Sequence, residues 1–298
     1  MHPTLVGAAL SGALALAVPM TALGFSDRMH QPKSVVPPAE TIDIPAGTLD
    51  YALPGEFLDS GRPAMAPSKR MAVPAFSIMK QQVSLADYDR CVAAGACAAP
   101  DAQEVSADVP VTGVSWLDAE AYARWFSGAT GASWRLPTDR EIAAAAAERF
   151  AGDSFSAGAD DPSNPAIRWI RQYQQEAAAK RPADPRPKPR GHYGPNSKGL
   201  EDFAGNVWEW TSTCYERVTL GAGGGHAGTT RNCGVRVIEG RHRAYMSNFV
   251  REGKSGGCAV GTPPDNLGFR LVKEKISFIA VINQRLQDLL GLARRNDT

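Results

Sequence analysis

The chain has almost no excess charge of either sign. Its 32 Lys and Arg residues balance 31 Asp and Glu residues, which gives a net charge of +1. A protein that binds nucleic acid or an anionic membrane surface through electrostatics needs a basic patch or a basic excess. We therefore expect no nucleic-acid partner.

The motifs of several common enzyme classes are also missing. The 298 residues contain no CxxC, CxxCH, HxxxH or HExxH spacing, and no phosphate-binding loop. These absences argue against a thioredoxin-like protein, a c-type cytochrome or a kinase, and no Ser/His/Asp order suggests a hydrolase. Three of the five histidines, His192, His226 and His242, fall on expected loops or strand ends without ligand spacing. We therefore do not expect a copper or iron site.

Only one segment is long and apolar. Residues from Leu5 to Leu23 are almost uncharged and end in small residues, and polarity returns at Asp27 and Arg28. This pattern predicts an export signal over residues 1–24. An uncleaved N-terminal anchor is the alternative, because the run lacks a basic start and is nearly long enough to cross a bilayer. Both interpretations predict a periplasmic or secreted protein with no other membrane contact.

Residues 25–40 are polar and rich in proline, which predicts a linker between the signal and the folded body. Capping residues and periodic apolar positions predict helices over residues 84–95, 115–128, 138–152 and 275–298, the last an amphipathic C-terminal helix. Short strands broken by proline are expected in IDIPAGTLDY and RMAVPAFSIMKQQVS. With 29 Gly and 22 Pro, residues 41–274 are expected to form a loop-rich α+β domain.

The five cysteines have to be explained in an oxidising compartment. Cys91 and Cys97 are six residues apart across the expected end of the first helix, where the chain turns back. This spacing predicts a local disulfide, with two separate buried thiols as the alternative.

Five stretches, in this order, resemble the formylglycine-generating-enzyme or sulfatase-modifying-factor family. They are IDIPAGTLDY, AFSIMKQQVSLADYDRCV, PVTGVSWLDAEAYARWFSGATGASWRLPTDREI, GPNSKGLEDFAGNVWEWTS and NLGFRLV. The resemblance covers about the whole of residues 41–274. It implies a fold similar to a C-type lectin domain, with little regular structure, a few helices and a twisted antiparallel sheet.

The stretch DFAGNVWEW, residues 202–210, is a candidate calcium site. Asp202 and Glu209 bring carboxylates beside the backbone carbonyls of a turn, and hard oxygen ligands suit calcium. In the family, the matching positions bind structural calcium through Asp202, the carbonyls of Gly205 and Val207, and Glu209. The alternative is that Asp202 only caps the turn while the tryptophans pack along a strand.

The family's copper-binding cysteine pair is missing. Aligned without gaps, RVIEGRHRAYMSNFVREGKSGG places Tyr245 and Val250 at the two thiol positions. Neither side chain is a soft ligand for copper. The resemblance therefore implies the fold but not the oxidation of a substrate cysteine.

Two pairings remain open for the other cysteines. In this fold, Cys214 and Cys233 would lie at the two ends of a glycine-rich hairpin loop, so a disulfide between them competes with a pairing of Cys233 and Cys258. If Cys258 is the unpaired thiol, it is a candidate reactive group.

A basic cluster crowds the segment that forms the active groove in the family. It comprises Arg236, Arg241, His242, Arg243, Tyr245 and Arg251, of which Arg241, His242 and Tyr245 join Cys258 as candidate catalytic residues. The cluster would suit an anionic ligand or an acidic peptide, or it is a salt-bridged strand.

Among family branches, CVAAGAC, EGRHRAYMS and GGCAVGTPPDNLGFRLV are most similar to the NirV-like accessory proteins of periplasmic nitrite reductase. This similarity implies an accessory or maturation role in denitrification, with the reductase or its maturation machinery as partner. The alternatives are a periplasmic metal- or thiol-dependent oxidoreductase and a calcium-stabilised lectin-like binding module.

Overall fold

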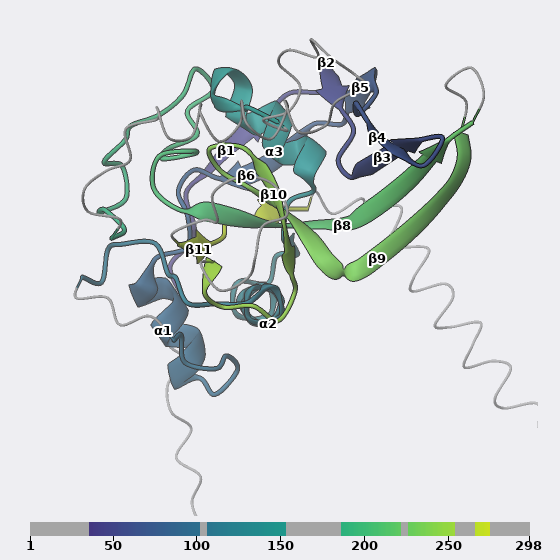
Figure 1. Ribbon diagram of the computed structural model, residues 1–298. Coiled ribbons are helices and arrows are strands. Elements are labelled where there is room, and N and C mark those ends of the chain that lie inside the picture. The colour runs from purple at the N-terminus through teal and green to yellow at the C-terminus, as the bar shows by residue number, and fades with distance from the viewer. Residues whose placement is uncertain (1–35, 102–105, 153–185, 222–225, 254–265, 275–298) are drawn as a thin grey trace, which may run out of the picture. The chain divides into compact units, whose positions relative to one another are not determined.

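The computed structural model of the protein describes residues 36–101, 106–152, 186–221, 226–253 and 266–274 (Figure 1). The predicted export signal, the predicted C-terminal helix over residues 275–298 and Cys258 lie outside these residues. Within the described part of the chain, no helix is both long and apolar enough to span a membrane.

The folded body begins at Val36, ahead of the predicted start at Thr41. Val36 and Ala39 are partly buried against the larger core cluster, and the Lys80 N–H donates to the Glu40 carbonyl at 3.0 Å. The prolines of this segment suggested a linker, but an extended proline-bearing backbone can also lie against a folded surface. Residues 36–40 therefore belong to the domain.

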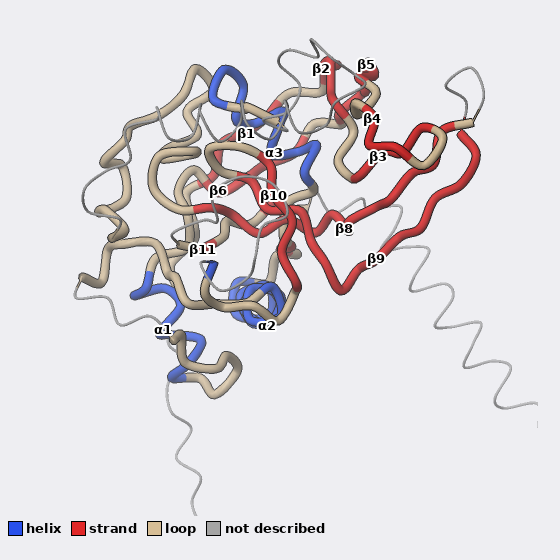
Figure 2. Tube along the Cα trace, viewed as in Figure 1, coloured by secondary structure: helices blue, strands red, loops and turns tan. Residues whose placement is uncertain are grey.

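Three α-helices form in the described residues, each beginning at a predicted capping residue (Figure 2). They are α1 (Leu85–Ala93), α2 (Trp116–Thr130) and α3 (Asp139–Ala146), and a 3₁₀ turn, η1 (Ala147–Arg149), follows α3. The side chains of Ser84, Ser115 and Thr138 each accept a hydrogen bond from the backbone N–H three residues later. Such a cap stabilises a helix by about 1 kcal/mol.

Two helices end at other residues than predicted. The second continues through Gly128 and ends before Gly131, whose φ is 71°. A glycine inside a helix costs only about 1 kcal/mol relative to alanine, which the buried aromatic face of α2 offsets. The third stops at Ala146, well before Gly152, because Ala147 has a φ of 47° and leaves the helical conformation.

The strands form three sheets, and most pairings are antiparallel. The first sheet has the order β1 (Thr41–Ile44), β6 (Phe76–Met79), β12 (Val272–Lys273) and β7 (Trp134–Arg135). The second has the order β10 (Arg243–Ser247), β9 (His226–Glu239), β8 (Trp208–Leu220), β3 (Glu56–Asp59) and β4 (Arg62–Ala64), with β11 (Leu267–Gly268) also paired with β8. The third consists of β2 (Gly47–Ala52) and β5 (Ser68–Val73). The α+β prediction is confirmed, but three sheets replace the single sheet expected, and β8 pairs in parallel with β3 and β11.

The hairpin of β8 and β9 carries β10 on its outer edge (Figure 1). Its register shifts between Trp210 and Cys214 and again between Cys214 and Tyr215. Such irregularities bend a strand and increase its twist. The hairpin thereby connects the core at Trp210 to the strands β3 and β4 near its far end.

An aromatic cluster forms the centre of the larger core. Tyr122 stacks on Tyr88 with ring centroids 5.7 Å apart and on Phe126 with centroids 5.6 Å apart. Phe269 meets Tyr122 edge to face at 5.4 Å, and Trp134 packs against Phe126 at 5.1 Å. Aromatic pairs of this kind contribute about 0.5–1.5 kcal/mol beyond the burial of their surface. The cluster fixes α1 and α2 against the strands that carry the candidate site.

Candidate functional site

The two positions aligned with the copper-binding thiols lie on β10 and just after it. Tyr245 pairs with Val237 of β9, and its hydroxyl accepts a hydrogen bond from the Gly55 N–H at 2.6 Å. Its ring meets Tyr215 edge to face, with centroids 5.3 Å apart. Val250 is partly buried against the larger core cluster. A phenol and an isopropyl group held by these contacts provide no soft ligand for copper.

The neighbouring candidates Arg241 and His242 have different environments. Arg241 is exposed, whereas His242 is only 8% exposed. The Nδ1 atom of His242 lies 2.8 Å from the Arg243 carbonyl, and the imidazole meets Trp208 edge to face at 4.6 Å. A contact with a carbonyl makes Nδ1 the protonated nitrogen of the ring. These contacts give His242 a structural role in holding the start of β10 against β8.

Other arginines of the predicted basic cluster are paired within the protein. Arg251 forms ion pairs with Asp101 at 2.7 Å and with Asp118 at 2.8 Å. The guanidinium carbon of Arg236 lies 3.8 Å from the centroid of the Trp116 ring. The ion pairs of Arg251 favour the salt-bridged interpretation at that residue, whereas Arg236 stacks on an aromatic ring and Arg241 is exposed.

A buried charge cluster lies beneath the start of β10. Arg243 forms ion pairs with Asp139 at 2.8 Å and with Glu239 at 3.0 Å, and all three residues are at most 1% exposed. The Tyr51 hydroxyl donates a hydrogen bond to Asp139. Two buried carboxylates thus share one guanidinium, which is costly unless one of them is protonated.

Glu239 is the carboxyl of this cluster whose pKa is raised. Burial raises the pKa of Glu239 well above its ordinary range, and the nearby Asp139 carboxylate raises it further. Its Oε2 atom has no hydrogen-bond partner among the described residues. Burial likewise raises the pKa of Tyr51, again with a contribution from Asp139. This cluster was not predicted from the sequence, although the spacing of Glu239 and Arg243, four residues apart across a turn, was a signal for an ion pair.

The predicted calcium turn is a structured part of the chain. Both carboxylate oxygens of Asp202 accept backbone hydrogen bonds, one from Gly191 and one from Tyr193. Asp202 has a φ of 60°, a conformation uncommon outside glycine. An added Cβ at Gly205 would lie 2.6 Å from Cγ of Tyr193. Gly205 is therefore required by the close approach of the Tyr193 ring.

Glu209 is also held by protein donors. Arg270 contacts both of its carboxylate oxygens, through Nε at 2.6 Å and Nη2 at 2.7 Å, and both residues are fully buried. The Gln82 amide donates to the same carboxylate at 2.8 Å. Bidentate pairs of this kind are among the strongest hydrogen-bonded contacts in proteins. Arg270 thus supplies the positive charge that calcium was expected to bring to Glu209.

The donor set matches calcium only in part. The backbone carbonyls of Gly205 and Val207 accept no hydrogen bond from the described residues, so two oxygen ligands are available. The two carboxylates, of Asp202 and Glu209, are already bonded to protein donors. Across the described ranges, no group of three or more His, Cys, Asp or Glu side chains is arranged to hold a metal ion. Calcium therefore stays a prediction.

The structure contains two disulfides. Cys91 pairs with Cys97 across the end of α1, and Cys214 of β8 pairs with Cys233 of β9. Their Cα atoms are 5.3 Å and 4.6 Å apart. The second pairing excludes the alternative between Cys233 and Cys258. Four of the five cysteines are thereby used, and Cys258 is the fifth.

Comparison with known proteins agrees with the resemblance. Residues 26–275 match the model of the sulfatase-modifying factor enzyme 1-like domain. The chain is 32% identical over 178 residues to the formylglycine-generating enzyme of Streptomyces coelicolor, which covers 55% of this chain and 52% of that protein. It is 30% identical over 171 residues to the inactive C-alpha-formylglycine-generating enzyme 2 of Mus musculus, which covers 55% of this chain and 48% of that protein. The chain thus spans about half the length of these curated relatives.

Among solved structures, PvdO from Pseudomonas aeruginosa superposes with a TM-score of 0.49 at 20% identity. The superposition covers 80% of this chain and 95% of PvdO. Because the family model matches most of the residues of the chain, this protein belongs to the FGE-sulfatase family of sulfatase-modifying factor enzyme 1-like domains.

Proposed function

We propose that this protein is an exported accessory factor that binds a periplasmic reductase or its maturation machinery and does not oxidise cysteine. Nitrite reductase is the partner favoured by the similarity to NirV-like proteins. The observation that carries the proposal is the replacement of the copper-binding thiols by Tyr245 and Val250. The first is bonded to the backbone of Gly55 and the second packs on the core, so both positions serve the fold.

Loss of the oxidase chemistry has a parallel among the relatives. The matching protein of Mus musculus is an inactive C-alpha-formylglycine-generating enzyme 2. A fold that keeps its framework while its reactive groups change can act by binding alone. The same interpretation fits this chain.

The disulfides support export. Cys91–Cys97 and Cys214–Cys233 are the kind of bond that forms and persists in the periplasm or outside the cell. They are rare in reducing compartments. A periplasmic partner is therefore accessible to this chain.

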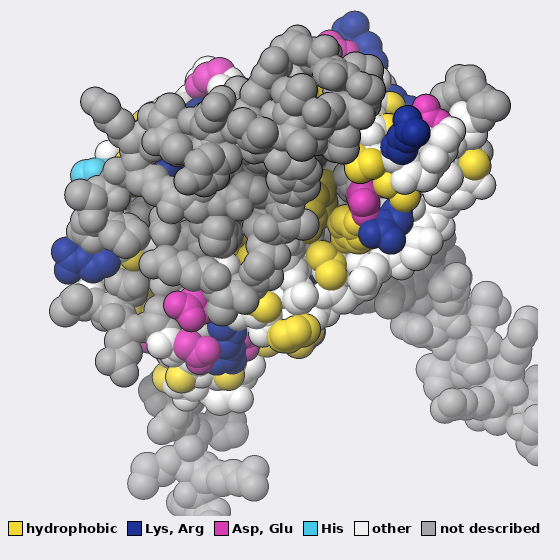
Figure 3. Space-filling view, in the orientation of Figure 1, with side chains coloured by type: hydrophobic (Ala, Val, Ile, Leu, Met, Phe, Trp, Pro, Cys, Tyr) yellow, Lys and Arg dark blue, Asp and Glu magenta, His cyan; other side chains and the backbone are white. Residues whose placement is uncertain are grey.

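An exposed apolar pair lies beside Val250 and provides a surface for the partner. Leu117 is 51% exposed and Phe249 is 71% exposed. The two side chains belong to neighbouring segments, because the Leu117 N–H donates to the Asn248 carbonyl at 3.4 Å. Figure 3 shows hydrophobic side chains on this face near α2, next to charged ones. Aromatic and aliphatic side chains exposed in this way are typical anchors of protein interfaces.

The test is co-purification of the tagged, full-length chain with nitrite reductase from periplasmic extract. We expect the reductase to co-purify with the wild type and to be lost with Leu117→Asp combined with Phe249→Asp. A buried charge at a contact costs several kcal/mol, enough to abolish a micromolar complex. The matched control is Met65→Asp, because Met65 is also an exposed apolar residue, at 40%, but lies outside this surface.

Two outcomes separate the parts of the proposal. If the wild type fails to retain nitrite reductase, the assignment of the partner is wrong. If the double variant retains the reductase as well as Met65→Asp does, the reductase does not bind at the Leu117 and Phe249 surface. Far-UV circular dichroism of all variants shows whether the fold is intact.

A thiol-dependent oxidoreductase is the second candidate function. The two disulfides use four cysteines and leave Cys258 as the one cysteine outside them. A free thiol in an oxidising compartment reacts if its pKa is lowered by nearby positive charge. Alkylation of the thiol in the native protein, followed by an assay of oxidoreductase activity, distinguishes this function from binding alone. A thiol-dependent oxidoreductase loses its activity on alkylation, whereas a protein that acts only by binding shows none before or after it.

A further inference from the structure

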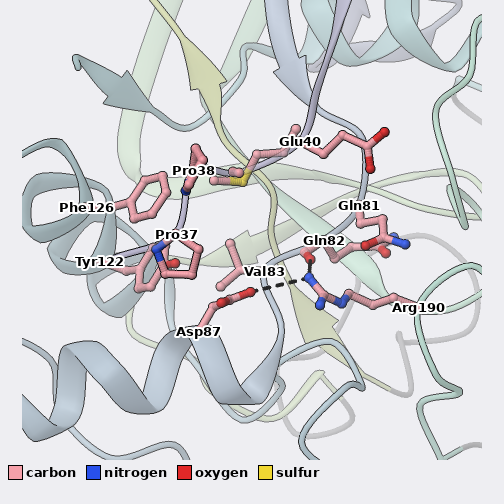
Figure 4. A pocket seen from close by; sticks show the side chains of 12 residues that line it. Pro37, Pro38, Glu40, Gln81, Gln82, Val83, Asp87, Tyr122, Phe126 and Arg190 are labelled. Carbon is pink, nitrogen blue, oxygen red and sulfur yellow. Dashed lines mark hydrogen bonds and ion pairs between the residues drawn. The ribbon is translucent and has the colours of Figure 1, made fainter. Parts of the chain in front are cut away.

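A cavity of about 280 Å³ is lined by the segment before β1, by α1 and α2, and by the loop that carries Arg190 (Figure 4). Its charged side chains already have ion-pair partners. The dashed line in Figure 4 joins Asp87 to Arg190, 3.3 Å apart, and Glu40 lies 3.0 Å from Lys80. These charges therefore select no ligand. The disulfide between β8 and β9, in contrast, lies beside an arginine that forms no ion pair with the described residues.

This disulfide, Cys214–Cys233, lies at an irregularity of the hairpin. Cys214 pairs with Arg236 across the strands, whereas the next residue of β8, Tyr215, pairs with Asn232. Residues 233–235 of β9 therefore have no partner on β8 and form a bulge. Bulges redirect side chains and are frequent beside active sites. Here the bulge carries Cys233.

The two cysteines of the disulfide differ in accessibility. Cys214 is only 3% exposed, whereas Cys233 is an exposed residue. An external reagent therefore approaches this disulfide from the side of Cys233. In the other disulfide both cysteines are buried, Cys91 at 0% and Cys97 at 8% exposure. Of the two disulfides, only Cys214–Cys233 presents an exposed cysteine.

Arg236 brings a positive charge to the buried sulfur. Its Nη1 atom donates to Cys214 Sγ at 3.2 Å and to the Ser212 carbonyl at 2.7 Å. The guanidinium carbon lies 3.8 Å from the centroid of the Trp116 ring, and Nε is buried without an acceptor among the described residues. Arg236 is thus held at the sulfur by a carbonyl and an aromatic ring.

The charge of Arg236 is only weakly offset by its surroundings. Burial lowers the pKa of Arg236, which the Glu120 carboxylate partly opposes. Burial in turn raises the pKa of Glu120, and the two side chains form no ion pair. Burial alone disfavours a thiolate at Cys214, but an adjacent arginine favours it. Arg236 therefore makes Cys214 the better leaving group of the two cysteines.

We propose that Cys214–Cys233 is a thiol–disulfide exchange site whose substrate is a cysteine thiolate of another molecule. The substrate thiolate attacks Cys233 Sγ, the bond between the two protein sulfurs breaks, and its electron pair leaves with Cys214. Arg236 stabilises the Cys214 thiolate. A second substrate thiolate then attacks the substrate sulfur of the mixed disulfide and releases Cys233. The protein disulfide becomes two thiols, which take up the protons of the two substrate thiols, and those become one disulfide.

The exchange site lies beside the surface proposed for the partner. The Asn248 N–H donates to the Gly234 carbonyl at 2.8 Å, which joins the bulge to the segment that carries Phe249. A protein docked on Leu117 and Phe249 would bring its own cysteines near Cys233. Exchange with a small thiol does not require that partner, so failure of one proposal is distinguishable from failure of the other.

The test is reduction of the folded, full-length chain by excess 2-mercaptoethanol, after its free thiol has been alkylated. Acid quenching, a second alkylation and peptide mass mapping follow each disulfide separately. We expect Cys214–Cys233 to be reduced roughly tenfold faster than Cys91–Cys97, the matched control, and the mixed disulfide to form on Cys233. Equal or slower reduction of Cys214–Cys233, or a mixed disulfide on Cys214, would overturn the proposal.

Variants of Arg236 test the role of its charge. Arg236→Met keeps a long side chain against Trp116, and we expect it to slow the reduction by about threefold or more, because a leaving thiol of higher pKa leaves more slowly. Loosened packing would instead speed the reaction, so slower reduction cannot come from a weakened fold. The mapping in the wild type decides the proposal by itself if Arg236→Met fails to fold.

Two further variants serve as controls for the charge. Arg236→Lys keeps it and should retain the rate to within about twofold. Arg217→Met removes a charge of the same hairpin that is paired with Glu56, and the rate should be unchanged. An unchanged or faster rate in Arg236→Met would show that Arg236 does not stabilise the leaving thiolate and would contradict the proposal.

Discussion

The hydroxyl of Tyr245 accepts a hydrogen bond from the backbone N–H of Gly55 at 2.6 Å, although the two residues are 190 positions apart in the sequence. The bond joins β10 to the loop between β2 and β3. Gly55 has a φ of 125°, and an added Cβ would lie 2.4 Å from the Glu216 carbonyl oxygen. The position aligned with a catalytic thiol is thus part of a tightly packed structural contact.

Replacement of Tyr245 by phenylalanine should lower the free energy of unfolding by about 1 kcal/mol, the usual contribution of one hydrogen bond. Urea-induced unfolding measures the change. Tyr193→Phe is the matched control, because the Tyr193 hydroxyl makes no hydrogen bond within the described residues, and its effect should stay within about 0.5 kcal/mol. Equal stability of Tyr245→Phe and the wild type would show that the contact with Gly55 contributes nothing.

Glu239 should make the protein less stable as the pH rises. Its pKa is raised in the folded state, first by burial and then by Asp139, so the folded chain holds a proton that the unfolded chain releases. The stabilising contribution of Glu239 is fully present below the ordinary Glu pKa of about 4.3. It falls as the pH rises from there towards the raised pKa of the folded state. Within that window the loss is about 1.4 kcal/mol per pH unit.

Unfolding in urea between pH 4 and pH 8 tests this dependence. Glu239→Gln mimics the protonated side chain, so the stability of the wild type relative to this variant should fall with rising pH. Glu274→Gln, which alters an exposed partner of Arg135, is the control and should leave the wild-type slope unchanged. Parallel curves for the wild type and Glu239→Gln would contradict a raised pKa at this carboxyl.

The cysteines predict one free thiol per oxidised chain. Thiol titration in denaturant should give one equivalent, and Cys258→Ser should remove it. Cys214→Ser combined with Cys233→Ser opens a loop of 19 residues and should lower the free energy of unfolding by about 3 kcal/mol. A thiol count of one that survives Cys258→Ser would show a different disulfide pairing.

Calcium remains testable at the turn of Asp202. We expect about one calcium per chain after dialysis into metal-free buffer, and its loss in Asp202→Ala. The carbonyls of Gly205 and Val207 supply two oxygens, and one carboxylate has to exchange a protein donor for the ion. Asp43→Ala is the control, because Asp43 bonds to Ser77 away from the turn. Atomic emission showing no calcium in the wild type would contradict this prediction and leave the compensation of the Glu209 charge to Arg270.

The sequence predicted the local elements well because their signals are local. Ser84, Ser115 and Thr138 marked helix starts, and the six-residue spacing of Cys91 and Cys97 predicted a disulfide at a helix end. Helix ends were predicted less well. At Gly128 tertiary packing outweighs a weak local preference, and Ala147 leaves the helix without a sequence signal.

The candidate site could be predicted only where one stretch of sequence contains it. The turn from Asp202 to Glu209 was found as a unit, but its partners Gln82 and Arg270 come from distant segments. The cluster of Asp139, Glu239 and Arg243 was missed for the same reason, since β10 and α3 meet only in the folded chain. Burial of a charge beside a distant partner has no local pattern, so Arg243 was predicted only as part of a basic cluster, and Arg270 was not predicted to have a role.

The absence of copper-dependent cysteine oxidation is tested most directly by Cu(I) titration of the full-length chain in competition with a chelator, together with an assay for oxidation of a cysteine-containing peptide. Tyr245→Cys combined with Val250→Cys restores thiols at both aligned positions and is the reference. We predict that the wild type binds no Cu(I) and leaves the peptide unchanged, while the double variant gains about one Cu(I) per chain. Stoichiometric Cu(I) in the wild type, with conversion of the peptide cysteine, would contradict the account and make this protein an oxidase.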